Sequence, residues 1–154
     1  MATVTFWNNH DFGGDSDTYN GAQRRSYNTS KAWDSLKTGA GTWLVVWDGS
    51  NYDGNYMKID PNTGWYNDLN KAGRGSDGDW KNQIKSFIIY GNAPSWWGSS
   101  STPPNNDLNL QAHDAVFCTG SYFNDDTAVF PANVVDSDLS NNYFVTNTSV
   151  NMSN

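Results

Sequence analysis

Short acidic stretches are the first residues in this sequence whose types could do chemistry. All sixteen acidic residues are aspartates, and several of them stand close together in polar segments. These segments are residues 15–17 (DSD), 77–79 (DGD), 124–126 (NDD) and 136–138 (DSD). Carboxylate oxygens are the ligands that Ca²⁺ and Mg²⁺ prefer. None of the segments has the spacing of an EF-hand loop, so we expect them to be solvated turns.

Catalysis finds little support in the residue types. His10 and His113 are the only histidines, and neither stands in a nucleophile or zinc-binding signature. Paired aspartates can hydrolyse glycosidic bonds, but their separation in space decides this, and a sequence alone does not contain it. The single cysteine, Cys118, lies in AVFCTG, which favours a small buried side chain over a reactive thiol. We therefore expect that the protein is not an enzyme.

Charge is distributed unevenly along a chain whose formal net charge is −7. All nine Lys and Arg lie at or before Lys85, whereas residues 91–154 contain six Asp and no Lys or Arg. This balance argues against nucleic acid and anionic membranes as partners, and it permits cation binding. No apolar run approaches the ~20 residues of a membrane span, and no signal-peptide pattern opens the chain. We expect a soluble product, cytoplasmic or secreted after removal of a signal.

The elements that position these residues are predicted to be strands. Aromatic residues make up 15% of the 154 residues, while the abundant Asp, Asn and Gly favour turns over helices. Four stretches rich in β-branched and aromatic residues are predicted strands. They are residues 3–7 (TVTFW), 42–47 (TWLVVW), 55–59 (NYMKI) and 85–90 (KSFIIY). A short helix is predicted over residues 65–71, between Gly64 and Gly73.

An internal repeat organises the first ninety residues. Trp7 is followed at fixed spacing by Phe12 and Gly14, and forty residues later Trp47 is followed at the same spacing by Tyr52 and Gly54. After each copy a serine begins or precedes a new strand, Ser35 in the first copy and Ser86 in the second. Repetition at this period indicates one supersecondary unit used twice. We expect the two aromatic rings to pack over an exposed bend and the glycine to adopt a positive φ, so the bend holds shape.

The two copies, VTFWNNHDFGG and VVWDGSNYDG, resemble the paired Greek-key signatures of the βγ-crystallin superfamily. The segment DSLKTGAGTWLVVW is similar to that family's passage from the first motif into the second. The resemblance covers residues 3–90 and implies an all-β, two-motif Greek-key sandwich of about eight strands. The second copy carries a longer insert, NDLNKAGRGSDGDW, before its serine.

The resemblance also implies a degenerate calcium site. Microbial family members commonly bind two calcium ions per domain through two Asn or Asp, two variable residues, Ser or Thr, and Ser. The matching positions here read Ser30, Lys31, Ala32, Trp33, Asp34, Ser35 and Lys81, Asn82, Gln83, Ile84, Lys85, Ser86. Asp34 keeps a side-chain oxygen at the fifth position, whereas Lys85 places a positive charge there.

By the family's pairing of the two motifs, a remaining calcium site would combine Asp34 with the carbonyl of Gln83 and with groups near Asp48 or Asn8. We expect weak calcium binding at one site at most. The alternative is that Asp34 caps a turn and that Lys85 replaces the ion with its own charge.

The domain organisation follows from these boundaries. We expect a βγ-crystallin-like domain at residues 2–91 (motifs at about 3–41 and 42–91), a linker at 92–106, and an acidic β-rich extension at 107–154. An echo of the motif, Phe117, Phe123 and Asp125 without the glycine, leaves a degenerate third Greek key open. An extension that exposes strand edges favours homodimerisation.

Three functions are compatible with this sequence. The first is a non-catalytic structural or stress-related protein. The second is a secreted inhibitor or toxin-like effector on the same fold, which would present residues 62–79 or 95–106 as its loop. The absence of an internal disulfide pair argues against this second function. The third is a carbohydrate-binding module that uses Trp96 and Trp97, although these rings are also suited to cover the sandwich.

Overall fold

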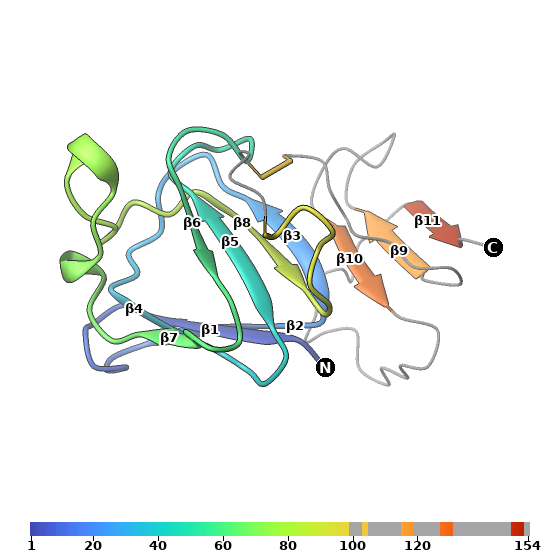
Figure 1. The fold of residues 1–154 in the computed structure, drawn as a ribbon, viewed down its shortest axis with the longest axis horizontal. Helices are drawn as coiled ribbons and strands as arrows, with labels where there is room; N and C mark the ends of the chain where they lie inside the picture. The colour runs from blue at the N-terminus through green and yellow to red at the C-terminus, as the bar shows by residue number, and fades with distance from the viewer. Residues whose placement is uncertain (99–102, 105–114, 119–126, 131–148, 153–154) are drawn as a thin grey trace.

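The computed structural model describes residues 1–98, 103–104, 115–118, 127–130 and 149–152 as an antiparallel β-structure (Figure 1). Its strands are β1 (Thr3–Trp7), β2 (Ser16–Asn20), β3 (Ala22–Ser26), β4 (Ser35–Thr38), β5 (Trp43–Trp47), β6 (Tyr56–Ile59), β7 (Trp65–Tyr66), β8 (Ser86–Tyr90), β9 (Ala115–Cys118), β10 (Thr127–Phe130) and β11 (Ser149–Met152). Two single-turn 3₁₀ helices, η1 (Leu69–Lys71) and η2 (Gly75–Asp77), follow β7. Among these described residues no helix is long enough to cross a bilayer.

The first ninety residues form two four-stranded sheets that exchange one strand. Sheet A has the order β2-β1-β4-β7, and sheet B contains β3-β8-β5-β6. Each copy of the repeat supplies four strands in chain order and places its third strand, β3 or β7, in the sheet built mainly by the other copy. This exchange is the Greek-key arrangement. The predicted all-β, two-motif sandwich is confirmed.

The core lies between the two sheets because alternate residues of each strand point inward. Val4 and Phe6 of β1 are fully buried, and so are Leu44 and Val46 of β5. The ring of Phe6 stacks on that of Trp33, with centroids 4.0 Å apart and an interplanar angle of 11°. Truncating a buried ring of this size to alanine typically costs about 3–5 kcal/mol of stability. A few large rings therefore supply much of the burial that holds the sandwich together.

Sheet B is buried on its outer face as well. Val45 and Trp47 of β5 and Ile88 and Tyr90 of β8 form a second buried cluster on the side away from sheet A. Trp43, Tyr56, Trp96 and Trp97 pack against it. The segment that follows β8 thus folds back over the sheet, and β8 is buried along its whole length.

The predicted helix over residues 65–71 is wrong for its first half. Trp65 and Tyr66 form β7 and pair with Lys37 and Leu36 of β4. Only residues 69–71 are helical, as one 3₁₀ turn in which the Asn70 amide donates to the Asp68 side chain. A hydrogen bond with the Lys71 side chain lowers the pKa of Asp68. Pairing with a distant strand overrode the local helical preference.

The described strands of the extension continue sheet B. β10 pairs antiparallel with β3, β9 pairs with β10, and β11 pairs with β9. Figure 1 shows these strands extending the sheet beyond β3, at the carboxyl-terminal end of the molecule. The echo at Phe123 and Asp125 lies outside the described residues, and so does most of the region predicted as the extension, so a third Greek key stays a prediction.

Candidate functional site

The two aromatic bends of the repeat have closely similar geometry. Trp7 and Phe12 meet edge to face with centroids 5.3 Å apart, and Trp47 and Tyr52 do so at 5.8 Å. Phe12 and Tyr52 both adopt left-handed backbone conformations, with φ of 59° and 57°. A non-glycine residue in this region is strained and persists only where its surroundings hold it.

Two serine hydroxyls hold the bends in this conformation. Ser35 Oγ accepts a hydrogen bond from the Phe12 amide (3.1 Å) and donates one to the Asn9 carbonyl (2.7 Å). Ser86 Oγ accepts from the Tyr52 amide (3.1 Å) and donates to the Gly49 carbonyl (2.6 Å). Each serine therefore ties its bend to the sheet, which agrees with the expectation that the bends hold shape.

The glycine of each copy makes room for a side-chain oxygen. A Cβ at Gly14 would lie 2.0 Å from Asn8 Oδ1, and a Cβ at Gly54 would lie 2.3 Å from Asp48 Oδ1. Both glycines also have positive φ, at 76° and 82°. Asn8 and Asp48, both predicted calcium-site residues, thus serve first to close their own bends.

Asp34 lies buried beneath the first bend, with 4% of its surface exposed. Its amide donates to the carbonyl of Trp7 (2.8 Å), and its Oδ2 lies 3.2 Å from the Lys81 ammonium. Its Oδ1 has no hydrogen-bond partner among the described residues. Lys81 itself is exposed, with 45% of its side chain in solvent. Asp34 and Lys81 line a small open pocket together with Asn9 and His10.

The second copy of the repeat reaches Asp34 as the resemblance implied. The Asn82 amide donates to the carbonyl of Trp33 (2.9 Å), and the Lys31 amide donates to that of Ile84 (2.9 Å). Residues 81–84, which include the predicted Gln83, therefore lie beside residues 31–34. Among the described residues the Gln83 carbonyl makes no hydrogen bond with Asp34, so its role as a ligand stays a prediction.

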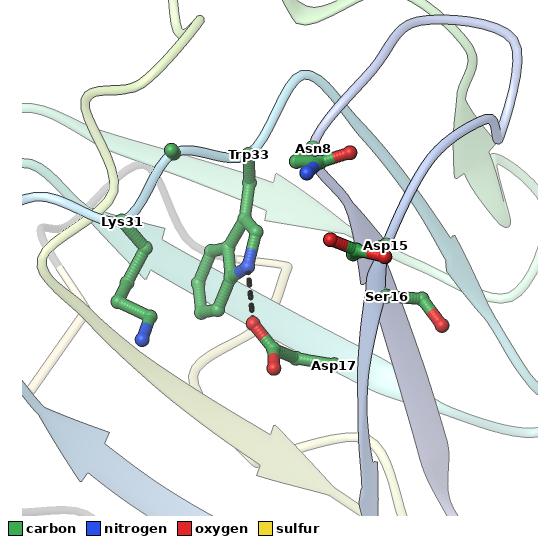
Figure 2. Close-up of a pocket in the computed structure, with 7 residues that line it drawn as sticks. Asn8, Asp15, Ser16, Asp17, Lys31 and Trp33 are labelled. Atoms are coloured by element: carbon green, nitrogen blue, oxygen red, sulfur yellow. Dashed lines mark hydrogen bonds between the residues drawn. The ribbon is translucent and has the colours of Figure 1, made fainter.

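Asn8 lines a different pocket, of about 200 Å³, whose wall includes Trp33. Figure 2 shows Asn8 and Asp15 on one side of this pocket and Lys31 on the other. The indole nitrogen of Trp33 donates to Asp17 Oδ2 at 2.7 Å. Asn8 and Asp34 thus line two separate pockets.

Asp48 is held by an arginine from the long insert of the second copy. Arg74 Nη1 lies 2.6 Å from Asp48 Oδ2, and the two side chains are 13% and 16% exposed. The same guanidinium donates through Nε to the carbonyl of Asp79 and through Nη2 to that of Asp77. Asn55 donates through its amide and its side chain to the Asp48 carboxylate. The insert is therefore folded onto the second bend.

Lys85 occupies the same backbone position as Asp34, because its amide donates to the carbonyl of Trp47 (2.9 Å) as that of Asp34 does to Trp7. Within the described part of the chain, Asp34 forms its ion pair with Lys81, and Asp48 forms its ion pair with Arg74. Sequence reasoning missed both partners. For Lys81 a signal existed, since it stands where the resemblance expects Asn or Asp.

Trp96 and Trp97 are half-buried against sheet B. The ring of Trp97 meets that of Trp43 at 5.0 Å, and the ring of Trp96 meets that of Tyr90 at 5.9 Å. Lys58 Nζ donates to the Trp97 carbonyl (3.0 Å) and lies over both indoles. These rings cover the sheet, as the alternative to glycan binding expected.

No group of three or more His, Cys, Asp or Glu gathers around a common point within the described residues. Asp34 and Asp48 each have a basic side chain at hand instead.

Part of this chain is similar to several solved structures. No protein-family model and no curated protein matches the chain. Among solved structures, a βγ-crystallin from an archaeon is 29% identical, with a TM-score of 0.44, over 58% of this chain and 98% of that one. The βγ-crystallin domain of the Abundant Perithecial Protein from Neurospora crassa, solved in its Ca²⁺-bound form, is 22% identical, with a TM-score of 0.44, over 57% of this chain and 87% of that one.

A βγ-crystallin domain from Flavobacterium johnsoniae is 14% identical, with a TM-score of 0.44, and the match covers 60% of this chain and 98% of that one. Over somewhat more than half of its length, this chain is similar to βγ-crystallin domains, microbial ones among them.

Proposed function

We propose that residues 2–91 act as a non-catalytic structural domain of the βγ-crystallin type, in which calcium binds weakly and at one site only. The observation that carries the proposal is the ion pair between the buried Asp34 and Lys81. The ammonium supplies from within the chain the positive charge that a bound ion would otherwise bring.

Lys81 competes with calcium at Asp34. A buried carboxylate is costly unless a cation compensates it, and Lys81 provides that compensation at 3.2 Å. Because its side chain is 45% exposed, it can leave the carboxylate for solvent when another cation arrives. Calcium must then displace a tethered charge, and this lowers its affinity.

The second bend is closed to calcium in this proposal. Arg74 makes three hydrogen bonds around Asp48, and both side chains of the pair are largely shielded. A guanidinium held on three sides is harder to displace than a single exposed ammonium. Asp48 and Arg74 therefore stabilise the fold and bind no ion.

The experiment is calcium titration by calorimetry on the metal-stripped full chain, with three variants. We expect weak binding near one ion per chain in the parent, binding about tenfold tighter in Lys81→Met, and none in Asp34→Asn. Arg74→Met is the matched control, because the same kind of charge is removed from the other bend. It should leave calcium affinity unchanged, because Asn55 still donates to both oxygens of Asp48. Tight binding that is indifferent to Asp34 would contradict the proposal.

The non-catalytic part of the proposal rests on the chemistry of the two pockets. The Asp34 pocket holds one histidine, His10, and no serine or cysteine nucleophile. The Asn8 pocket contains Ser16 but no histidine to activate it. Hydrolytic activity of the purified chain that Asp34→Asn and His10→Ala both abolish would overturn this part.

A second candidate function, inhibition of a proteinase, is favoured by one observation. Residues 73–79 form a loop closed by a β-bridge between Gly73 and Asp79 and held from inside by Arg74. Inhibitors present rigid exposed loops of this kind. The test is a panel of proteinases assayed with the parent chain and with residues 75–78 replaced, where inhibition that the replacement removes would support the function.

A further inference from the structure

We propose that the outer face of sheet A binds an acidic oligosaccharide, with a sugar ring stacked on Trp65 and a sugar carboxylate paired with Lys37. This surface, called the Trp65 face below, comprises the outward side chains of the sheet along the bottom of Figure 1. Its residues are Thr5, Trp7, Phe12, Thr18, Lys37 and Trp65. The inference is independent of calcium and of the structural role.

A single row of side chains crosses the face. In the sheet register Thr18 is opposite Thr5, Thr5 is opposite Lys37, and Lys37 is opposite Trp65. Residues opposite one another on neighbouring strands point to the same side of a sheet. Val4, Phe6 and Leu36 point the other way into the core. Two hydroxyls, one ammonium and one indole therefore stand in line on the outside of the sandwich.

Trp65 is exposed to a degree that is unusual for its type. With 53% of its surface in solvent, it is one of two large hydrophobic residues that the structure leaves exposed among the residues it describes, the other being Met1. Phe12 meets its ring edge-on at 6.2 Å, and Trp7 in turn meets Phe12. The indole is thus supported from one side and keeps a broad apolar surface open.

Polar groups surround this surface at the positions a sugar needs. Thr5 and Thr18 hydroxyls share a hydrogen bond of 2.9 Å, which leaves further lone pairs for a ligand. At the other end Asp11 is fixed by Asn67, whose side chain donates to Asp11 Oδ1 at 2.8 Å. An apolar ring face flanked by hydroxyl and amide groups matches a pyranose, which has a C–H face and a rim of hydroxyls.

Charge selects an acidic sugar over a neutral one. Lys37 is exposed, and the described residues provide it with no ion-pair partner, although the chain as a whole has a net charge of −7. An exposed ammonium beside an exposed indole is complementary to a uronic acid, whose carboxylate stands at the edge of its ring. Asp11, at the edge of the surface, repels a carboxylate, so the acid group of the sugar must lie on the Lys37 side of Trp65.

The outer face of sheet B is a similar surface that another segment of the same chain covers. On sheet B, the matching aromatic cluster is covered by Trp96 and Trp97, and its lysine, Lys58, is bound to the Trp97 carbonyl. On that face the aromatic rings and the lysine have partners within the chain. On sheet A the corresponding groups, Trp65 and Lys37, stay open.

The test measures binding of the full chain to trimers of galacturonate and glucuronate and to the neutral trimer cellotriose, by calorimetry and by ¹⁵N NMR shifts. We expect a uronate trimer to bind and cellotriose to bind about tenfold more weakly. Trp65→Ala should abolish binding, and Lys37→Met should weaken the uronate about tenfold while leaving cellotriose unchanged. Trp65→Phe should restore part of the affinity.

Trp97→Ala is the matched control, because it removes an indole from the other outer face. Binding that survives Trp65→Ala, or that Trp97→Ala removes, would overturn the assignment of the surface. Equal affinity for the uronate trimers and for cellotriose, or indifference to Lys37→Met, would overturn the choice of an acidic ligand. No binding to any of the trimers overturns the inference as a whole and leaves the calcium titration unaffected.

Discussion

The two copies of the repeat share a backbone and differ in what lies over them. Both bends have an aromatic pair, a left-handed residue and a serine that ties them down. In the second copy Trp47 is fully buried, and the Arg24 guanidinium lies 5.6 Å from the Tyr52 ring centroid. In the first copy the ring next to Phe12 is the exposed Trp65. Local sequence sets the bend, and distant segments set its exposure.

The largest expected effect is a difference between the two leading tryptophans. Trp47→Ala should lower the free energy of unfolding by about 3–5 kcal/mol, because it removes a fully buried ring. Trp7→Ala should cost about 1–2 kcal/mol, because the half-buried Trp7 leaves less apolar surface to lose. Urea denaturation of both variants measures the difference. Equal losses would mean that the first bend is as closed as the second.

The next effect separates the two ion pairs. Arg74→Met should cost about 2–3 kcal/mol, because it leaves Asp48 shielded without its cation and frees the insert. Lys81→Met should cost a similar amount, about 2–3 kcal/mol, because it leaves the buried Asp34 carboxylate without its cation, although Lys81 itself is about half in solvent. Thermal melts with and without calcium test this pair of variants. Calcium should restore the thermal stability of Lys81→Met and not that of Arg74→Met. The reverse result would mean that the calcium site lies at Asp48 and not at Asp34.

A smaller effect contrasts the outer faces. Trp97→Ala should lower the free energy of unfolding by about 1–2 kcal/mol, since it uncovers Trp43 and removes the indole over which the Lys58 ammonium lies. Trp65→Ala should change it by about 0.5 kcal/mol or less, since its ring is mostly in water. Chemical denaturation of the two variants measures both losses. A large loss in Trp65→Ala would show that the indole serves packing and would weaken the case for a ligand there.

The fold was predictable from sequence because its signal is local and repeated. The spacing of tryptophan, aromatic residue and glycine, together with Ser35 and Ser86, is contained in two short segments. The ion pairs were not predictable, because Arg74 reaches Asp48 across 26 residues through the folding of the insert. Trp65 was predicted in a helix for a similar reason, since its partner Lys37 lies on a strand far away in sequence. Exposure of an indole depends on such distant pairings, so sequence singled out Trp96 and Trp97 and passed over Trp65.

The smallest expected effect is a loss of stability at alkaline pH. It should arise in the first copy of the repeat and not at the matched position of the second. In the matched positions of the sheet register, Tyr19 is opposite Val4 in the first copy, and Ile59 is opposite Leu44 in the second. Tyr19 packs on Phe6 and Phe87, and its hydroxyl lies 2.7 Å from that of Tyr27. Burial, and then the neighbouring Tyr27, raise the pKa of Tyr19 far above its ordinary value of 10.0.

The sign of the effect follows from where the proton is held. The folded state keeps the Tyr19 proton while the unfolded chain releases it near pH 10, so stability is complete below pH 10 and falls as pH rises above it. One group contributes at most about 1.4 kcal/mol per pH unit, and partial exposure of Tyr19 reduces this. Urea denaturation at pH 9, 10 and 11 should show a shallower decline in Tyr19→Phe than in the parent. The control is Ile59→Val, which trims the matched residue of the second copy and should lower stability equally at all three pH values. If stability declines equally in Tyr19→Phe and in the parent, Tyr19 releases its proton in the folded state as readily as in the unfolded chain.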